Sequence, residues 1–294
     1  MISVCGEAII DLLAIGPTTY EARPGGSPAN TAVALARLGV PVAMLGRFST
    51  DRFGRQLREH LVASGVDLSC AVDAPEPGSL AIVSRDEAGD ASYRFVLDGT
   101  ADWQWEDDEL VLPAGTDTLH TGSLALSLAP AVERLVARTR CTVSIDPNLR
   151  PGLLRPDVGE AVERWLPLSD IWKASAEDVA LLHPGEDVVD VARRWAAAGP
   201  GLVLVTGGAG GVTAVVAGEV LHVDAHPTDV VDTLGAGDTF TAGLLAALHD
   251  GAHLGSRLSL SPDDVRGALD LALRAAAVTC SRPGADPPYA HELV

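Results

Sequence analysis

The chain has 294 residues, of which 47% are hydrophobic, enough to bury the core of one large domain or of two smaller ones. Its 40 acidic and 21 basic residues give a formal net charge of −19, which argues against a surface that collects nucleic acid or anionic lipid. Any anion that this protein binds must therefore be held by a local site.

Single residue types narrow the function classes further. Lys173 is the only lysine and no glycine-rich loop precedes it, so the chain lacks a phosphate-binding loop of the G-x-x-x-x-G-K-[ST] type. The four cysteines form no C-x-x-C pair, which predicts neither a zinc site nor a disulfide framework and favours a reducing cytoplasm. The apolar N-terminal run contains Glu7 and Asp11 and lacks a basic start, so we expect a buried strand there rather than a signal peptide or a membrane span.

Along the chain, short apolar runs alternate with longer helical patterns. Strands are expected at "ISVCGEAII", "PVAMLGRF", "TDTLHTG", "CTVSIDP", "DIWKAS" and "GLVLVTG", with helices from about residues 28, 51, 130 and 188. This alternation is typical of βαβ units, in which helices cover both faces of a mostly parallel sheet. The run "GVTAVVAGEVLHVDA" then predicts a hairpin, and helices are expected near 237–249 and 262–278.

Two segments interrupt this alternation. Residues 79–98 show two alternating strands around the turn "EAGD", and residues 12–25 are irregular. A small antiparallel lid attached to the main sheet accounts for both. Arg94 alternates there with aromatic neighbours, so we expect one face of its strand to lie over a ligand or against a partner subunit. Because no flexible linker or repeat divides the chain, we expect one domain over residues 1–294, with lid segments at about 12–25 and 79–98.

The stretch "VVDTLGAGDTFTAG", residues 230–243, carries the clearest chemical signal. Gly235 and Gly237 allow a tight turn and a close approach to a ligand, and helical spacing follows them. Helix N-termini bind anions, because unpaired N–H groups and the positive end of the helix dipole coincide there. Asp238 at this end is either an N-cap or a general base beside an anion hole.

A second stretch, "RPGGSPANTAVALARLG", has the same character. Gly25 and Gly26 permit close approach, and Asn30 lies early in the following helix, where its amide either binds a sugar hydroxyl or caps the helix. Asp11 and Arg150 follow other apolar runs, at the sheet edge where ligands bind in open α/β folds. The alternatives are a solvated acid at Asp11 and a structural salt bridge at Arg150.

Together these two stretches resemble the paired signatures of the ribokinase, or PfkB, family of sugar kinases. The signature D-T-x-G-A-G-D is matched from Asp232 to Asp238. The signature G-G-x-x-x-N-x-A, with L-G further on, is matched at Gly25, Gly26, Asn30, Ala32, Leu38 and Gly39. The resemblance implies a ribokinase-like α/β fold and ATP-dependent phosphorylation of a sugar hydroxyl, assisted by magnesium.

The resemblance also implies roles for single residues. Asp238 would be the general base, and the N–H groups of Gly235, Ala236 and Gly237 would form the anion hole. The substrate would be bound by Asp11, Gly25, Gly26, Asn30, Arg94 and Arg150, and the phosphates and ribose of ATP by Ser175, Thr206, Gly208 and Gly237. Asp178 would hold magnesium through water.

The same resemblance implies a monovalent cation site, suited to potassium, beside the anion hole. Its ligands would be the carboxylate of Asp232 and the backbone carbonyls of Leu234, Thr279 and Gly284. The alternative for Asp232 is a carboxylate that stabilises the turn. Pro288 stands where some relatives contribute a serine, so potassium activation is less firmly indicated than the general base.

The runs "GEAIIDL", "DPNLRP" and K-x-S resemble the fructokinase branch, so fructose is the expected acceptor. Within the same chemistry, 2-keto-3-deoxygluconate, ribose or a nucleoside are alternatives, and a catalytically silent sugar or nucleotide sensor is the alternative from another class. A nicotinamide oxidoreductase is not indicated, because "VTGGAGGV" lacks the full G-x-G-x-x-G and precedes a strand. The resemblance also implies a homodimer paired through the lid.

Overall fold

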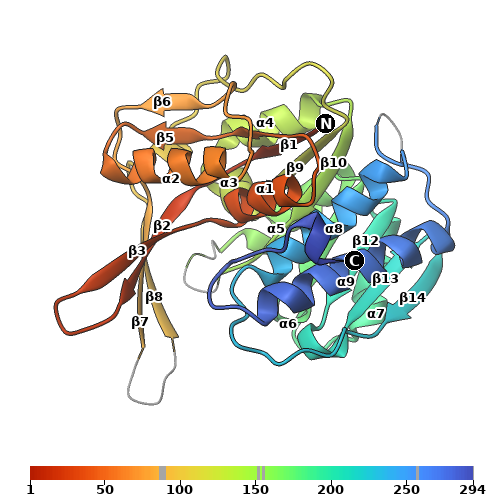
Figure 1. Ribbon diagram of the computed structural model, residues 1–294. Coiled ribbons are helices and arrows are strands. Elements are labelled where there is room, and N and C mark those ends of the chain that lie inside the picture. Colours follow the sequence, from red (N-terminus) through yellow and green to blue (C-terminus); the bar gives the residue numbers. More distant parts are fainter. Residues whose placement is uncertain (86–90, 151–152, 154–155, 256–257, 294) are drawn as a thin grey trace.

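An eight-stranded sheet runs through the middle of the computed structural model (Figure 1), which describes residues 1–85, 91–150, 153, 156–255 and 258–293. Its strand order is β14-β13-β12-β11-β10-β9-β1-β4, and all neighbours from β12 to β4 are parallel. The expected C-terminal hairpin adds the antiparallel pairs β12–β13 and β13–β14. The strands are β1 (Ile2–Cys5), β4 (Val42–Leu45), β9 (Thr118–Gly122), β10 (Thr142–Asp146), β11 (Ile171–Ser175), β12 (Leu202–Thr206), β13 (Val212–Val216) and β14 (Glu219–Val223).

Helices cover both faces of this sheet, because buried parallel strands send apolar side chains to either side. In β12, Leu202 and Leu204 enter one core, while Val203 and Val205 enter the other. The first core lies under α1 (Ser27–Arg37), α2 (Arg52–Ala63), α8 (Ala236–Asp250) and α9 (Pro262–Cys280). The second lies under α3 (Ser123–Leu128), α4 (Pro130–Arg138), α5 (Val158–Trp165), α6 (Ala176–Leu182) and α7 (Val188–Ala197).

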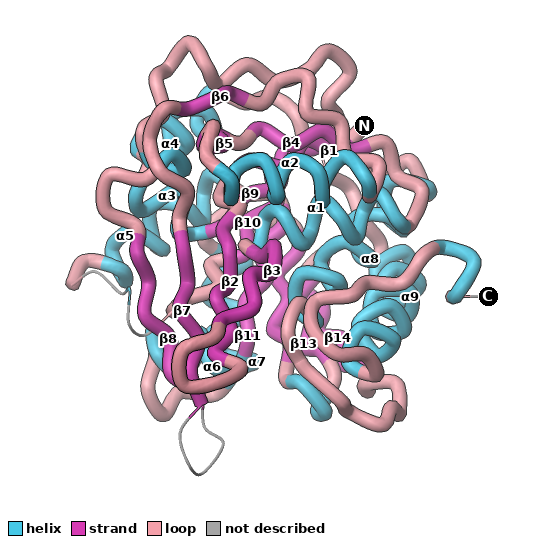
Figure 2. Tube along the Cα trace, turned by 60° about the vertical axis from the view of Figure 1, so that its left-hand side comes forward, coloured by secondary structure: helices cyan, strands magenta, loops and turns pink. Residues whose placement is uncertain are grey.

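A second, four-stranded sheet of order β3-β2-β7-β8 forms the lid, which projects from the body (Figures 1 and 2). It comprises β2 (Ile9–Ala14), β3 (Tyr20–Gly25), β7 (Leu80–Arg85) and β8 (Ala91–Val96). Its outer pairs are antiparallel and its central pair, β2–β7, is parallel. The two strands expected within residues 79–98 are present, whereas the turn expected at 87–90 lies outside the described residues.

Two expectations about the N-terminal region are wrong. Residues 12–25 are not irregular, because most of them belong to β2 and β3; β3 is an edge strand, where Pro24 removes no inner ladder hydrogen bond. The first apolar run is also not one strand. It divides between β1 in the body and β2 in the lid, with Gly6 at a φ of 152° between them. Asp11 therefore lies inside a lid strand and not at the end of a body strand.

Smaller elements complete the chain. A parallel pair of short strands, β5 (Arg47–Ser49) and β6 (Val72–Ala74), precedes the lid strand β7. Short 3-10 turns occur at Ala101–Trp103, Leu166–Leu168, Gly208–Gly210 and Ala290–Glu292. Within the described part of the chain, no helix combines the length and the apolar character needed to cross a lipid bilayer.

Candidate active site

Asp238 lies where the two glycine-containing stretches meet. It contacts Ser27, which is 211 positions away in the sequence. Its Oδ1 accepts a hydrogen bond from Ser27 Oγ at 2.7 Å, and its Oδ2 accepts one from Asn30 Nδ2 at 2.8 Å. Both partners lie in α1, and the carboxylate is only 9% exposed. Burial raises the pKa of Asp238, and the hydrogen bonds from Asn30 and Ser27 oppose that shift.

The capping alternative for Asp238 is wrong. The N-cap of α8 is Gly235, which adopts the left-handed conformation with a φ of 75° and makes no side-chain cap. Asp238 is the third residue of the helix, and its carboxylate turns away from the helix end toward α1. Asn30 likewise does not cap α1, because its amide donates to Asp238. The start of α8 therefore presents its N–H groups without a capping side chain.

Gly25 lies close to the Asp11 side chain of β2, and Gly26 lies close to the backbone of the segment before β2. A Cβ on Gly25 would lie 2.4 Å from Asp11 Oδ2, and one on Gly26 would lie 2.8 Å from the carbonyl oxygen of Glu7. Burial raises the pKa of Asp11 to about 6; the charge of Arg150 lowers it and that of Asp238 raises it. Asp11, Arg150 and Asp238 therefore share one electrostatic environment.

Lys173 is the residue that sequence reasoning missed. Lys173 is the middle residue of β11, and its buried ammonium forms a 2.7 Å ion pair with Asp146 Oδ2, which is also buried. A Cβ on Gly237 would lie 3.2 Å from Lys173 Nζ, so the ammonium lies beside the expected anion hole. Burial lowers the pKa of Lys173, but the charges of Asp146, Asp178 and Asp238 outweigh it, and the net shift is upward. Lys173 is the only lysine in the sequence, and this was the feature that could have identified it as a candidate site residue.

Asp178 and Ser175 form the start of α6. Ser175 Oγ accepts from the Asp178 N–H at 3.0 Å, and Asp178 Oδ2 accepts from the Ser175 N–H and hydroxyl, both at 2.8 Å. Asp178 Oδ1 also accepts from the Leu149 N–H at 2.8 Å, so this carboxylate fixes the loop after β10. Among the described residues no group of three or more His, Cys, Asp or Glu side chains could hold a metal. Both oxygens of Asp178 already accept hydrogen bonds from the protein, so a magnesium ion would reach this carboxylate only through its own waters.

Thr206 is the last residue of β12, and Gly208 follows shortly after it. The Thr206 hydroxyl donates to the carbonyl oxygen of Ala174 at 3.4 Å, and Gly208 has a φ of 56°. Arg150 is exposed and donates weakly to the carbonyl oxygen of Leu149 at 3.4 Å. Arg94 is exposed on β8, where it lines a pocket of about 360 Å³ with Leu128 and Leu153.

The carboxylate of Asp232 stabilises the turn before α8. Its Oδ1 accepts from the Leu234 N–H at 3.1 Å, and its Oδ2 accepts from the Gly284 N–H at 2.9 Å. The carbonyl oxygens of Thr279 and Gly284 each accept one backbone N–H, at 3.1 and 3.0 Å. Each of these carbonyl oxygens keeps a second lone pair, and oxygen donors of this kind suit a monovalent cation such as potassium.

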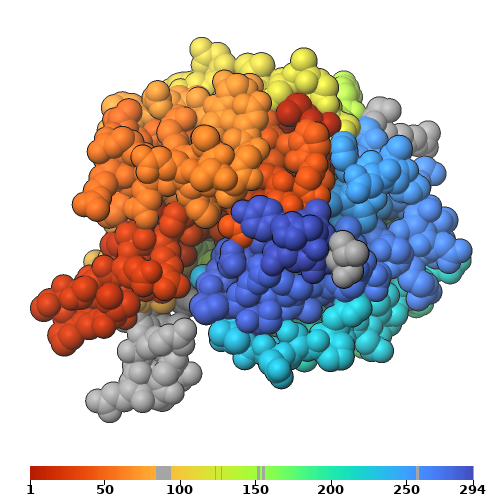
Figure 3. Space-filling view, viewed as in Figure 1, coloured from red at the N-terminus to blue at the C-terminus, as the bar shows by residue number. Residues whose placement is uncertain are grey.

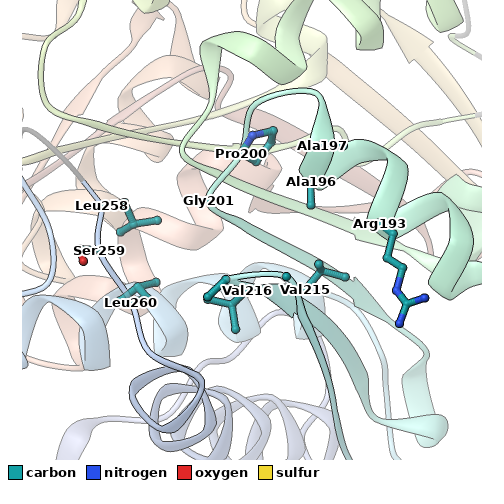
Figure 4. A pocket seen from close by; sticks show the side chains of 12 residues that line it. Arg193, Ala196, Ala197, Pro200, Gly201, Val215, Val216, Leu258, Ser259 and Leu260 are labelled. Carbon is teal, nitrogen blue, oxygen red and sulfur yellow. The ribbon is translucent and has the colours of Figure 1, made fainter.

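A separate pocket of about 520 Å³, drawn in Figure 4, is lined by none of these residues. Gly201 in its wall precedes β12, Val216 ends β13, and Ala217 and Gly218 form the turn between β13 and β14. The pocket therefore lies at the opposite edge of the sheet from Asp238 and Lys173. Its wall includes Arg193 and otherwise consists mainly of small and apolar residues.

Comparison with known proteins matches the chain to the pfkB family carbohydrate kinases over residues 1–292. A fructokinase from Klebsiella pneumoniae is 37% identical over 270 residues, 88% of each protein. A fructokinase double mutant from Vibrio cholerae, with fructose, ADP and potassium bound, has a TM-score of 0.85 at 29% identity, covering 97% of this chain and 94% of that one. Aminoimidazole riboside kinase from Salmonella enterica, complexed with aminoimidazole riboside and an ATP analog, has a TM-score of 0.86 at 27% identity, covering 99% and 98%.

Proposed function

The chain belongs to the pfkB family of carbohydrate kinases and is an ATP-dependent sugar kinase, and on this premise we propose that its acceptor is fructose. The similarity to fructokinases supports this substrate, since one such relative carries fructose in its structure. The observation that carries the chemistry is the buried carboxylate of Asp238, bonded to Ser27 and Asn30 at the start of α8.

In the proposed reaction, Asp238 is the general base. It accepts the proton from the sugar hydroxyl while that oxygen attacks the γ-phosphate of ATP, and the bond to the bridging oxygen of ADP breaks. Ser27 and Asn30 hold the carboxylate in a fixed orientation. Asp11 and Gly25 lie together on the lid side of this carboxylate, where they bind other hydroxyl groups of the sugar.

Positive charge for the transferring phosphoryl group comes from two sources in this proposal. The N–H groups of Gly235, Ala236 and Gly237 and the dipole of α8 form the anion hole. The Ala236 N–H also donates to the Thr233 carbonyl at 3.2 Å, so it must be shared with or released to the phosphate. Lys173 adds a full positive charge beside Gly237, in the place of a phosphate-loop lysine.

Bound ions complete the proposed site. Asp178 would hold magnesium through water, and the ion would neutralise charge on the ATP phosphates. The oxygens of Asp232, Leu234, Thr279 and Gly284 would hold potassium. The relative from Vibrio cholerae, which has potassium bound, supports that part of the proposal. A riboside is the second candidate acceptor, supported by the similarity to the aminoimidazole riboside kinase.

The test measures ADP release with fructose, ribose, 2-keto-3-deoxygluconate and adenosine in turn. The parent is compared with Asp238→Asn, which keeps both hydrogen-bond partners in place. We expect turnover with fructose, and a decrease in kcat of roughly 10²–10⁴-fold in the variant. Turnover with another acceptor alone would reject fructose. A variant as active as the parent would reject Asp238 as the base, and ATP binding without turnover of any acceptor would favour the sensor alternative.

A further inference from the structure

The lid is joined to the body by a small number of chain crossings. β1 leads into β2 through residues 6–8, β3 leads into α1 at Gly26, Ser79 leads into β7, and Leu97 follows β8. Figure 1 shows the lid strands leaving the body together, and Figure 3 shows the red N-terminal lid segment projecting beside the blue C-terminal third. We call the residues at these crossings the roots of the lid strands. The position of the lid depends on the contacts that hold these roots to the body.

A single buried carboxyl group contacts two of these roots. Asp102 is 3% exposed and lies in the turn Ala101–Trp103. Its Oδ1 accepts a hydrogen bond from the Ala8 N–H at 2.9 Å, and its Oδ2 lies 2.6 Å from Ser79 Oγ. The root of β2 and the root of β7 are thus held by the two oxygens of one side chain.

The same cluster continues to a third root. Ser79 Oγ lies 2.6 Å from Thr100 Oγ1, and the Thr100 hydroxyl donates to the carbonyl oxygen of Leu97 at 2.7 Å. The Ile10 N–H also donates to the Ser79 carbonyl oxygen at 3.1 Å, which ties the first two roots together directly. All these contacts lie on the body side of the lid, away from its tip.

Counting protons shows which form of Asp102 satisfies this cluster. Two hydroxyl groups supply two protons, but three contacts, Asp102–Ser79, Ser79–Thr100 and Thr100–Leu97, each require one. In the ionised form, Ser79 donates to Asp102. In the protonated form, Asp102 supplies the third proton by donating to Ser79, so that Ser79 donates to Thr100 and Thr100 to Leu97. Burial raises the pKa of Asp102 to about 6, although its hydrogen bonds to Ser79 and Ala8 oppose the shift, so this carboxyl group binds a proton more readily than an exposed aspartate does.

We propose that Asp102 is a positioning residue for the sugar site, because it fixes lid strand β2, and with it Asp11, relative to Asp238. Asp11 is three residues from Ala8, about 10 Å of extended chain, and pairs with Ala81 of β7. A displacement at the root is therefore carried directly to Asp11. ATP binding should not depend on the contacts of Asp102, because Lys173 and α8, which are expected to bind the phosphates, belong to the body.

The physical test does not depend on which sugar is accepted. Hydrogen–deuterium exchange is measured on peptides covering residues 9–14, 80–85 and 202–206 in four variants: Ser79→Ala, Asp102→Ala, Asp102→Asn and Ser3→Ala. An asparagine preserves every contact, because its amide donates to Ser79 while its oxygen accepts from Ala8. Ser3→Ala is the matched control, because it removes a 2.8 Å contact between a buried serine and Thr116 in the body.

We expect exchange in the two lid peptides to accelerate roughly 2- to 10-fold in Ser79→Ala and Asp102→Ala, the change expected for one lost hydrogen bond. Exchange should stay within twofold of the parent in Asp102→Asn and Ser3→Ala, and the 202–206 peptide should be unchanged throughout. Unchanged lid exchange in Ser79→Ala, or equal acceleration in Ser3→Ala, would overturn the proposal. Ser79→Ala decides the outcome if Asp102→Ala fails to fold.

The kinetic test rests on the proposed function. In Ser79→Ala, the KM for fructose should rise roughly 2- to 10-fold, while kcat and the KM for ATP stay within twofold of the parent. Asp102→Asn should restore the parental KM. Equal losses in the KM for fructose, the KM for ATP and kcat would indicate a general structural role and reject the positioning role. If the parent does not phosphorylate fructose, the proposed acceptor is wrong, and the exchange result alone decides the role of Asp102.

Discussion

The buried ion pair of Lys173 and Asp146 is the unusual feature at the scale of single residues. Taking two charges out of water is costly, and such pairs are often no more stabilising than apolar residues of the same volume. Lys173 lies beside Gly237, where a phosphate is expected, so function rather than stability is the better reason for this pair. Asp146 then positions the ammonium when no phosphate is bound.

Replacing Lys173 by methionine should lower kcat/KM for ATP roughly 10²-fold, because one donor to the developing charge is lost. It should also destabilise the fold by about 3–5 kcal/mol, because Asp146 is left unpaired. The double variant Lys173→Met with Asp146→Leu separates these effects in urea unfolding and steady-state kinetics. We expect it to regain stability but not activity. Recovery of activity in the double variant would contradict a role for Lys173 in phosphate binding.

Glu7 predicts a dependence of stability on pH. This carboxyl group is 4% exposed, and burial, with the charges of Asp102 and Asp238, raises its pKa from 4.5 to about 8; its own backbone and Arg150 oppose the shift. Because the folded-state pKa is raised, its contribution to the free energy of unfolding is highest below about pH 4.5 and falls as the pH rises toward about 8.

The variant Glu7→Gln removes this titration. The difference between its thermal midpoint and that of the parent should rise between about pH 5 and pH 8 and level off above that range, because only the parent must ionise a buried carboxyl group. Scans of both proteins in the same series of buffers measure this difference. A difference that stays constant with pH would show that Glu7 ionises as readily in the folded chain as in the unfolded one.

At the scale of elements, the start of α8 depends on its glycine. Gly235 has a φ of 75°, and a Cβ there would lie 2.6 Å from Ala285 Cβ in the loop that also bonds Asp232. The left-handed conformation costs an L-residue about 1–2 kcal/mol even without a clash. The anion hole and the loop after α9 therefore constrain each other.

Gly235→Ala should destabilise the protein by more than about 1 kcal/mol and lower kcat, because α8 must move from the 284–285 loop. Gly267→Ala is the matched control: Gly267 is exposed in α9, with no other atom near the new methyl group, and alanine there should stabilise by roughly 0.5–1 kcal/mol. Urea unfolding midpoints and kcat are measured for both variants and compared with those of the parent. A harmless Gly235→Ala would show that the turn tolerates a side chain.

At the scale of the whole molecule, the net charge of −19 causes self-repulsion that salt screens. Tetramethylammonium chloride should therefore raise the thermal midpoint by screening alone. Potassium chloride at equal ionic strength should raise it further by binding at Asp232, by up to about 2.7 kcal/mol at a hundredfold excess over its dissociation constant. Each kcal/mol corresponds to about 2–4 °C in a chain of 150–250 residues, and to somewhat less in a longer one.

The variant Asp232→Asn is the control for this comparison. It should abolish the difference between the two salts while leaving the screening effect, because it changes the net charge by only one unit. Identical midpoints for the parent in both salts would contradict a potassium site. The readout is stability, so it does not require an active enzyme.

Much of the architecture was predictable, because its signals are local. The alternation of apolar runs and helical patterns indicated the mostly parallel sheet, and the predicted fold class, enzyme class and family are confirmed. The helix expected from about residue 51 begins at Arg52 with Asp51 as its N-cap, which accepts from the Gly54 N–H. The roles of the single site residues stay predictions, although Asp238, Asn30 and Asp11 do lie together.

The sequence by itself determined the family, the two glycine motifs and the periodicities, because these are carried by neighbouring residues and by residue types that only certain backbone conformations accept. Only the tertiary structure decided that the first apolar run divides between body and lid, that Lys173 reaches Gly237, and that Asp102 joins two lid roots. These contacts connect side chains far apart along the chain. Burial and partnership, which set the pKa and role of a polar group, exist only after folding.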